Sequence, residues 1–335
     1  MKVLVVGGAG YIGSHMTRML IGQGHEAVVL DNLASGHRDS IPPQTFLKGD
    51  LAQRVLLDTV LSTRTFDCVM HFASFGHAGE SAAYPARYYW NNVAHTLNLF
   101  DAMVKKQVRR LVYCSTAAVY GEPRYAPVEE AHPRNPTSPY GRSQWMAEQV
   151  LADYERAHGL RSVSMRCFNV AGAHPLGGIG ERHDPETHLV PLALKAASGR
   201  VRGVAIYGTD YDTPDGTCVR DYVHVADVCH AHLLAMEHLV EGGASRAYNI
   251  GSGRGHSVRE VIACASRVSG VAIAVTEAMR REGDPEKVVA DTRLAQRELG
   301  WEPQYSDLET IVTHAWQWER SGRATRRHSA DRVTH

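Results

Sequence analysis

The chain has 335 residues, and its 36 Lys and Arg are balanced by 36 Asp and Glu. That length suffices for one large domain or two. A formal net charge of zero gives no electrostatic reason to expect binding to nucleic acid or to an anionic membrane surface. Because no apolar run approaches the roughly 20 residues that span a bilayer, we expect no membrane partner.

Scattered cysteines and the start of the chain both indicate a reducing, cytoplasmic environment. The first residues run straight into an apolar strand pattern rather than a secretory signal. The six cysteines lack C-x-x-C spacing and are expected to be buried thiols: Cys68, Cys114, Cys167, Cys218, Cys229 and Cys264. His224, His230 and His232 cluster, but no Cys or acid at ligand spacing accompanies them, so we expect no metal site.

The first 33 residues carry the pattern of a dinucleotide-binding site. A β-branched run at residues 2–6 predicts a buried parallel strand, and residues 14–24 have apolar residues at helical spacing. Between them lie Gly7, Gly10 and Gly13. A second strand, residues 27–30, ends at Asp31. Strand, glycine turn, helix, strand and acid follow one another as in a Rossmann nucleotide site.

Each of these residues has its own physical role. Gly7 allows a tight turn, Gly10 lets a pyrophosphate approach the backbone, and Gly13 lets the helix pack closely on the strand. The helix N-terminus offers free N–H groups and a partial positive charge to phosphate. Asp31 can accept hydrogen bonds from an adenosine ribose and repels a 2′-phosphate, which favours NAD over NADP. A glycine motif alone also fits a tight structural turn, and its context favours the nucleotide.

Alternating strand and helix patterns continue to residue 168 and predict an α/β fold with a doubly wound parallel sheet of Rossmann type. Strands are expected at residues 45–48, 66–73, 111–114 and 162–168, with a long helix over 84–105 and another from 140 onward. The polar loop 32–38 lies where the adenosine half of a cofactor rests. Asp50 follows a strand and suits either an adenine amino group or a helix cap, and spacing alone does not decide between them.

The alternation stops at Asn169, and residues 170–189 form a long irregular stretch rich in Gly, Pro and His. Because long loops in compact domains are usually functional, a smaller α+β substrate-capping domain is expected to begin here. We predict an NAD-binding domain at 1–168, to which segments near 219–247 and 286–296 return, a substrate-binding domain mainly at 169–320, and a frayed tail at 321–335.

A set of short motifs gives the chain a specific resemblance. They are Gly7-Gly8-Ala9-Gly10-Tyr11-Ile12-Gly13, His71-Phe72-Ala73, Gly79-Glu80-Ser81, Asn91-Asn92-Val93, Ser115-Thr116-Ala117-Ala118-Val119-Tyr120-Gly121, Ser138-Pro139-Tyr140-Gly141-Arg142-Ser143, Arg166-Cys167-Phe168-Asn169, Arg220-Asp221-Tyr222-Val223-His224 and Arg280-Arg281-Glu282-Gly283-Asp284. With them the chain resembles the extended short-chain dehydrogenase/reductases, and within these the UDP-glucose (UDP-galactose) 4-epimerases. The resemblance implies interconversion of the two UDP-sugars, with N-acetylhexosamine and uronic acid forms as further candidates, through a transient 4-keto sugar and tightly held NAD.

The same resemblance assigns catalytic roles. Tyr140 matches the family's general base, a phenol whose pKa of about 10 must be lowered, and the positive nicotinamide ring can lower it. Thr116 matches the Ser or Thr that shares a hydrogen bond with the sugar's 4-oxygen. Gln144 stands where the family has a lysine that binds the nicotinamide ribose and supplies positive charge. Gly76 stands where many of these epimerases have another lysine, near the cofactor pyrophosphate.

Further residues are expected, by resemblance, to contact the two ligands. Those for NAD are Gly7, Gly10, Tyr11, Ile12, Gly13, Asp31, Asn32, Asp50, Leu51, Phe72, Ala73, Asn92, Ser115, Tyr140, Gln144 and Phe168. Those for the UDP-sugar are Thr116, Tyr140, Asn169, Leu189, Tyr207, Arg220, Arg281, Asp284 and Val288. Arginine forks suit a diphosphate, an acid suits the uridine ribose, and Tyr207 suits uracil. Val288 stands where some relatives carry a bulky Tyr, which predicts room for an N-acetyl group.

Two other functions stay open on the sequence. A nucleotide-sugar 4,6-dehydratase or decarboxylase needs an acid directly after the Thr, and Ala117 and Ala118 stand there instead. A catalytically weak homologue that binds NAD or a UDP-sugar is favoured by Gln144 alone. Relatives are often homodimers joined by two helices from each subunit, which implies a homodimer here through residues 84–105 and 140–155.

Overall fold

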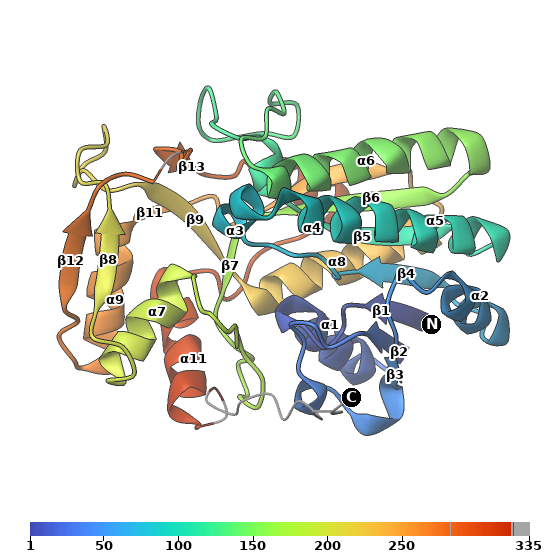
Figure 1. Cartoon of the computed structure of the whole chain (residues 1–335), viewed down its shortest axis with the longest axis horizontal. Helices are drawn as coiled ribbons and strands as arrows, with labels where there is room; N and C mark the ends of the chain where they lie inside the picture. Colours follow the sequence, from blue (N-terminus) through green and yellow to red (C-terminus); the bar gives the residue numbers. More distant parts are fainter. Residues whose placement is uncertain (282, 323, 325–335) are drawn as a thin grey trace.

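The computed structural model describes residues 1–281, 283–322 and 324. Two parts lie side by side along the long axis of the molecule (Figure 1). The larger part is a parallel sheet with helices on both faces, and the smaller part is built on short sheets and three helices. Among the described helices, none has both the length and the apolar character needed to cross a membrane.

Seven strands form the large sheet, in the order β10-β6-β5-β4-β1-β2-β3. Their bounds are β1 Lys2–Val6, β2 Glu26–Asp31, β3 Phe46–Lys48, β4 Cys68–His71, β5 Arg110–Thr116, β6 Arg161–Cys167 and β10 Arg246–Ile250. Every neighbouring pair is parallel. The strand order runs outward in both directions from β1, so the prediction of a doubly wound Rossmann-type sheet is confirmed.

Helices cover both faces of this sheet because each face of every central strand is apolar. On β1, Val3 and Val5 pack into the core under α1 and α8, and Leu4 and Val6 pack into the core on the opposite face. All four side chains are almost completely buried. Burying one such side chain contributes about 1.5–3 kcal/mol. The helices are α1 Tyr11–Gly22, α8 Val225–Val240 and α10 Arg293–Leu299 on one face, and α2 Arg54–Thr63, α5 Thr96–Lys105 and α6 Pro139–His158 on the other.

The long helix expected over 84–105 is interrupted. It consists of α4 Pro85–Tyr89, a π-helical turn Trp90–His95 and α5, preceded by the short α3 Ala78–Ala83. Buried Asn92 lies in the π turn and is fully engaged, since it accepts from the Phe75 amide and donates to Phe75 O and Ser143 Oγ. π-Helical turns often occur at functional sites, and this one fastens the loop after β4. That loop includes Phe72 and Ala73, because β4 ends before them rather than at residue 73 as expected.

The smaller part is centred on β9 Val219–His224. It pairs with β7 Asn169–Ala171, β11 Gly255–Ser257 and β13 Lys287–Val288. Two further strands, β8 Val204–Tyr207 and β12 Val275–Ala278, pair beside α7 Leu189–Ala197, α9 Val258–Ser269 and α11 Leu308–Arg320. Of the segment 219–247, therefore, β9 lies in the smaller part, whereas α8 and the start of β10 lie in the large sheet's layers. Of 286–296, β13 lies in the smaller part and α10 packs on α8.

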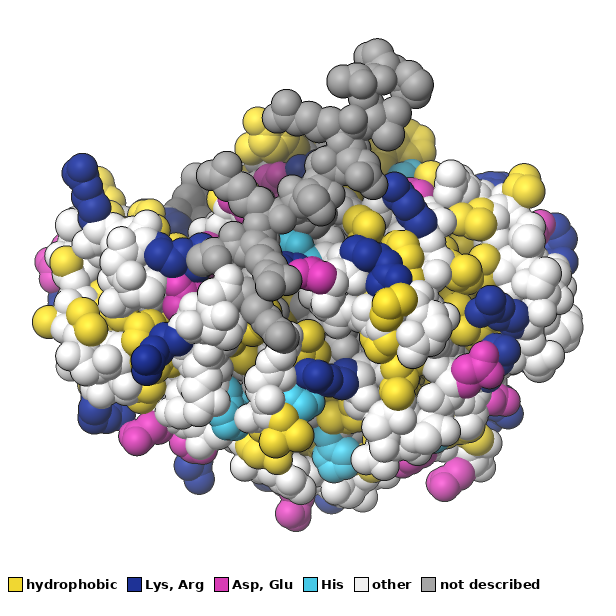
Figure 2. All heavy atoms as spheres, turned by 90° about the horizontal axis from the view of Figure 1, so that it is seen from below, with side chains coloured by type: hydrophobic (Ala, Val, Ile, Leu, Met, Phe, Trp, Pro, Cys, Tyr) yellow, Lys and Arg dark blue, Asp and Glu magenta, His cyan; other side chains and the backbone are white. Residues whose placement is uncertain are grey.

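The surface carries charges of both signs without segregation on the face shown in Figure 2, where several histidine side chains also gather. Short 3₁₀ helices also occur, at Arg38–Ser40, Pro43–Thr45 and Ala117–Val119.

Most of the predicted frayed tail, residues 323 and 325–335, lies outside the described residues. At Ala324 the prediction is wrong, because this side chain is buried against Ala173 and Trp318.

Candidate active site

The glycine turn after β1 is sterically closed on one side and open on the other. A Cβ on Gly7, whose φ is 76°, would stand 2.5 Å from the Ala73 amide nitrogen. A Cβ on Gly13 would stand 2.2 Å from Gly7 O. At Gly10 the nearest atom would be 3.4 Å away, and Gly10 caps α1 without any side-chain hydrogen bond. The first-turn amides of α1, with Tyr11 and Ile12, are therefore available to a phosphate.

Asp31 lies at one end of this cradle. Its Oδ2 accepts from the Ala9 amide at 2.9 Å, and its Oδ1 accepts from the Leu33 amide at 2.7 Å. Burial raises the pKa of this carboxyl, and the two amide hydrogen bonds oppose the rise. Asp31 thus holds the loops on both sides of the site in place.

Asp50 lies beside this loop and is engaged locally. Its Oδ2 accepts from Asn32 Nδ2 at 2.7 Å, and its Oδ1 accepts from the Ala52 amide at 2.8 Å. The N-cap of α2 is Gln53, so the alternative of Asp50 as the cap of that helix is wrong. Leu51, directly after it, is buried. An adenine contact by Asp50 stays a prediction.

Tyr140 and Thr116 meet where β5 ends and α6 begins. Ser138 caps α6 by accepting from the Gly141 amide at 3.1 Å, which places Tyr140 in the first turn. Burial raises the pKa of the Tyr140 phenol, and its hydrogen bond with Thr116 opposes that rise. A Cβ on Gly76 would stand 4.0 Å from the phenol oxygen. A side chain at position 76 would therefore start directly beside the predicted base.

Gln144 is one turn further along α6 and is completely buried. Its Oε1 accepts from the Tyr113 hydroxyl at 2.5 Å. Its Nε2 is buried and has no hydrogen-bond partner among the described residues. An orphaned buried donor costs about 1–3 kcal/mol unless a ligand satisfies it. A ribose hydroxyl would accept from Nε2, so the residues present fit a nicotinamide dinucleotide.

The other predicted cofactor residues differ in what they offer. Phe72 and Ala73 follow β4 at the sheet's carboxyl edge, and Phe168 follows β6. The Ser115 hydroxyl donates to Glu148 Oε1 at 2.5 Å, so its side chain faces α6 and only its backbone is available to a cofactor. The Tyr11 hydroxyl donates to Gly172 O at 2.7 Å and thereby ties α1 to the smaller part.

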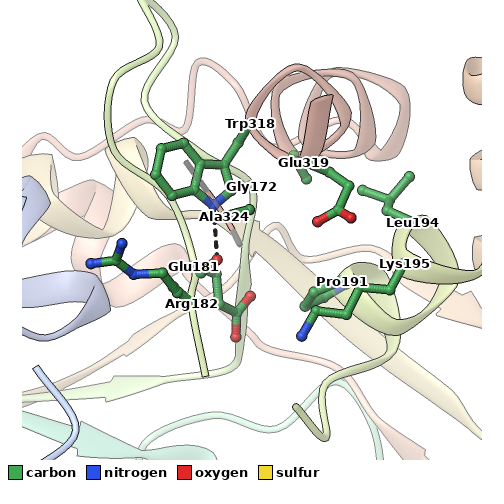
Figure 3. A pocket seen from close by; sticks show the side chains of 10 residues that line it. Gly172, Glu181, Arg182, Pro191, Leu194, Lys195, Trp318, Glu319 and Ala324 are labelled. Carbon is green, nitrogen blue, oxygen red and sulfur yellow. Dashed lines mark hydrogen bonds between the residues drawn. The ribbon is translucent and has the colours of Figure 1, made fainter. Parts of the chain in front are cut away.

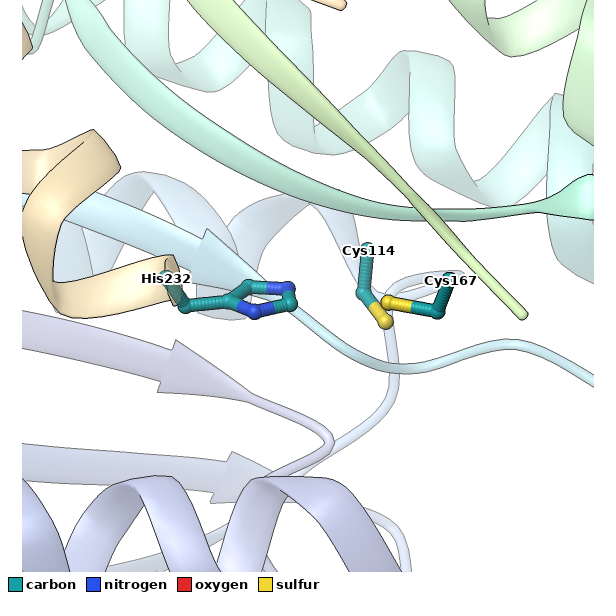
Figure 4. A group of neighbouring side chains, drawn as sticks. All are labelled: Cys114, Cys167 and His232. Carbon is teal, nitrogen blue, oxygen red and sulfur yellow. The ribbon is translucent and has the colours of Figure 1, made fainter. Parts of the chain in front are cut away.

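A cluster of Cys114, Cys167 and His232 lies beneath this edge of the sheet (Figure 4). One ligand atom of each lies within 4.8 Å of the others. The hydrogen bond with Cys167 lowers the pKa of the Cys114 thiol, although burial opposes it. The two cysteines lie on adjacent strands, β5 and β6, so their proximity is a product of the parallel pairing and was not visible in the sequence.

Four predicted substrate residues converge in the smaller part. Arg220 donates to Asp284 Oδ1 at 2.5 Å, and Arg281 donates to Asp284 Oδ2 at 2.9 Å. The Arg281 guanidinium lies 4.7 Å from the centroid of the Tyr207 ring. Two arginines, an acid and an aromatic ring thus form one patch suited to a nucleoside diphosphate.

The remaining predicted substrate residues also lie in the smaller part. Asn169 is exposed on β7, and Leu189 begins α7. Val288 pairs with Arg220 across β13 and β9 but is only 8% exposed, because it packs against Val119 and Phe168. Its small side chain belongs to the wall behind the patch.

The family of NAD dependent epimerases and dehydratases has a sequence model that matches residues 3–251. The chain belongs to this family. It is 47% identical over 320 residues to a UDP-glucose 4-epimerase of Halalkalibacterium halodurans, covering 96% of each chain. The similarity of sequence therefore extends through both parts of the fold.

Solved structures agree with this membership. The UDP-glucose 4-epimerase of Brucella ovis in complex with NAD has a TM-score of 0.92 at 46% identity, covering 94% of this chain and 97% of that one. The enzyme of Bifidobacterium longum in complex with NAD⁺ and UDP has a TM-score of 0.91 at 35% identity, covering 96% and 98%. The predicted family resemblance is confirmed. The individual site residues stay predictions, now supported by their convergence.

Proposed function

We propose that this protein is an NAD-dependent UDP-glucose 4-epimerase that interconverts UDP-glucose and UDP-galactose. The observation that carries the proposal is the Tyr140–Thr116 pair, which is half-buried where β5 ends and α6 begins. Similarity over 96% of the chain to a UDP-glucose 4-epimerase supports the same reaction. The cofactor is NAD, consistent with the family and with Asp31.

When bound, NAD accepts a hydride from the sugar's C4 and later returns it. Tyr140 takes the proton of the C4 hydroxyl as that hydride leaves, and gives it back after the 4-keto sugar has turned to present its other face. Thr116 holds the phenol through its hydrogen bond and can share another with the sugar oxygen.

The smaller part holds the nucleotide while the sugar turns. Arg220 and Arg281 are placed to bind the diphosphate, which would compete with the ion pairs they make to Asp284. The Asp284 carboxylate is then released toward the uridine ribose, with Tyr207 against the uracil. Anchoring only the UDP leaves the hexose free to rotate between Tyr140 and the nicotinamide position. Asn169 and Leu189 border the same space.

The competing functions make different predictions in one experiment. Purified protein is incubated with UDP-galactose, UDP-glucose and their N-acetyl and uronic acid analogues, and the products are separated by chromatography. We expect UDP-glucose from UDP-galactose, with no net formation of free reduced nicotinamide. Bound nucleotide without turnover would favour the binding homologue, and a dehydrated or decarboxylated sugar would favour the other enzymes. Ala117 directly after Thr116 argues against elimination.

A Tyr140→Phe variant tests the proposed base directly. We expect it to retain bound NAD and UDP while turnover falls by at least about 100-fold, the lower range for loss of a positioned general base. An active Tyr140→Phe variant would contradict the proposal.

We further propose that the protein is a cytoplasmic homodimer. Large apolar side chains are exposed on the two predicted interface helices: Tyr84 is 63% exposed, Trp90 65% and Met146 41%. Pairing these helices across a two-fold axis would bury them. A Trp90→Glu variant should be monomeric by light scattering at concentrations where the wild type is dimeric.

The proposed cytoplasmic location is supported by the cysteines. All six are free thiols, which suits a reducing compartment.

A further inference from the structure

Four metal-binding side chains gather on the segment between β7 and α7. They are Glu181, His183, Glu186 and His188, and one ligand atom of each lies within 4.8 Å of those of the other three. This segment lies within the smaller part and leads directly into α7. The four residues lie outside the histidine cluster considered in the sequence, and neither the catalytic pair nor the arginine patch includes them.

The separations among these atoms scatter around the spacing of a tetrahedral site, and the two shortest are hydrogen bonds. Glu181 Oε1 lies 2.5 Å from His188 Nδ1 and 3.0 Å from His183 Nδ1. Glu186 Oε1 lies 3.6 Å from His188 Nδ1 and 3.9 Å from His183 Nδ1. In a tetrahedral zinc site with bonds of about 2.0 Å, neighbouring ligand atoms are about 3.3 Å apart. The four observed separations lie on both sides of that value.

Surrounding contacts hold the Glu181 backbone and orient the Glu186 carboxylate. Trp318 Nε1 donates to Glu181 O at 2.9 Å, and the Glu181 carboxylate points away from the indole ring (Figure 3). Glu186 Oε1 accepts from the Thr187 and His188 amides at 2.9 and 3.0 Å. Outer contacts of this kind fix the ligands of natural metal sites.

Charge also favours a bound cation here. The Glu181 and Glu186 side chains are only 5% and 3% exposed, which brings two carboxylates into a poorly solvated place. Lys195 Nζ lies 3.5 Å from Glu186 Oε2, on the outer oxygen of that carboxylate. With neutral imidazoles, Lys195 compensates one of the two buried negative charges, and a bound cation would compensate the other.

We propose that Glu181, His183, Glu186 and His188 bind one divalent transition-metal ion, with zinc as the expected occupant. Two imidazole nitrogens disfavour calcium and magnesium, which prefer all-oxygen sites, and four protein ligands close a tetrahedral shell. The ion would be structural: it would hold the segment that leads into α7, which begins at Leu189. This site departs from the sequence-based expectation of no metal and does not depend on the proposed reaction.

The test is metal binding by the full-length, untagged protein after removal of metal with a chelator. Zinc is titrated against a chromophoric competitor, and cobalt(II) is added separately to read coordination geometry from its visible absorption. We expect one zinc per chain and the intense bands of tetrahedral cobalt(II). His183→Gln and His188→Gln should each weaken binding by more than about 100-fold, since loss of a ligand exceeds the effect of losing an outer contact.

Control variants separate this site from the other histidines. His158→Gln removes an exposed imidazole at the end of α6 and should leave affinity and spectrum unchanged. The His188 side chain is 45% exposed, so His188→Gln is expected to fold even if His183→Gln does not, as checked by circular dichroism. Cobalt spectra without tetrahedral bands, or equal zinc binding by wild type and His188→Gln, would overturn the proposal.

Discussion

Replacing Gln144 by Lys restores a positive charge one helical turn from Tyr140. Side chains at positions i and i+4 of a helix have Cβ atoms about 5–6 Å apart. At an effective dielectric constant of about 20, an ammonium about 6 Å from a phenolate stabilises it by roughly 3 kcal/mol. That corresponds to a fall of about 2 in the pKa of Tyr140, which burial holds above its ordinary value.

The structure shows that the single substitution has a cost. Gln144 Oε1 accepts from the Tyr113 hydroxyl, and an ammonium cannot accept. A buried hydroxyl left without an acceptor costs about 1–3 kcal/mol. The double variant Tyr113→Phe with Gln144→Lys removes that hydroxyl, and Gln144→Met serves as a control of similar size that lacks the charge.

The assay is the pH profile of kcat/KM for UDP-galactose. In both Lys variants we expect the acidic limb to move down by about 2 pH units. Near neutral pH the phenolate becomes more abundant, but it is also a weaker base, so the expected rise is about tenfold rather than a hundredfold. Gln144→Met should not move the limb. A Lys variant whose rate is unchanged or lower, in a protein that still binds NAD, would refute this account of the site.

Three further measurements test specificity and stability. If the small side chain of Val288 leaves room for an N-acetyl group, the wild type converts UDP-N-acetylglucosamine. Val288→Tyr should then lose that activity and keep its activity on UDP-galactose. A wild type that is inactive on the N-acetyl sugar would contradict this prediction. Glu148→Gln breaks a buried ion pair in which Arg166 NH2 lies 2.6 Å from Glu148 Oε2. We expect it to lower the free energy of unfolding, measured with urea, by about 3–5 kcal/mol. A loss below about 1 kcal/mol would count against a buried ion pair. Burial raises the pKa of Asp221 from 3.8 to about 6, so its folded state binds a proton more tightly than its unfolded state. The stability that this proton provides is complete below about pH 4 and is lost by about pH 6, a change of roughly 3 kcal/mol; Asp221→Asn should flatten that part of the profile, and an equal slope in both proteins would refute the assignment.

The elements around the cofactor could be predicted because their signals are local. Each glycine of the turn allows a close contact with atoms that are only a few residues away in sequence or follow the adjacent strand. The spacing of the glycines is therefore enough to predict the turn. Strand Lys2–Val6 and the acid Asp31 belong to the same short unit. The π-helical turn at Trp90–His95 could not be predicted, because the apolar stripe of residues 84–105 tolerates one extra residue in a turn.

Contacts between distant segments explain what the sequence left out. Ser115 was expected at the cofactor, yet its hydroxyl donates to Glu148, 33 positions away, which in turn pairs with Arg166 on β6. Nothing near Ser115 indicates that partner. The sequence also contains Glu181, His183, Glu186 and His188 at short spacing. Their segment has neither the periodicity of a helix nor that of a strand, so the sequence could not predict that the four side chains meet.

Position 144 shows why a departure from a family pattern is best interpreted through its neighbours. Taken alone, Gln144 indicates a lost charge and a weakened enzyme. In the structure its oxygen is already committed to Tyr113, which fixes the amide so that Nε2 is the group left to meet a ribose. We therefore propose that residues 113 and 144 act as a pair: the amide would keep the binding role of the family's lysine, and the electrostatic role of that lysine would fall to the oxidised nicotinamide. Lowering the pKa of Tyr140 then depends on the charge of the bound cofactor, which couples the base to the oxidation state that the first step requires.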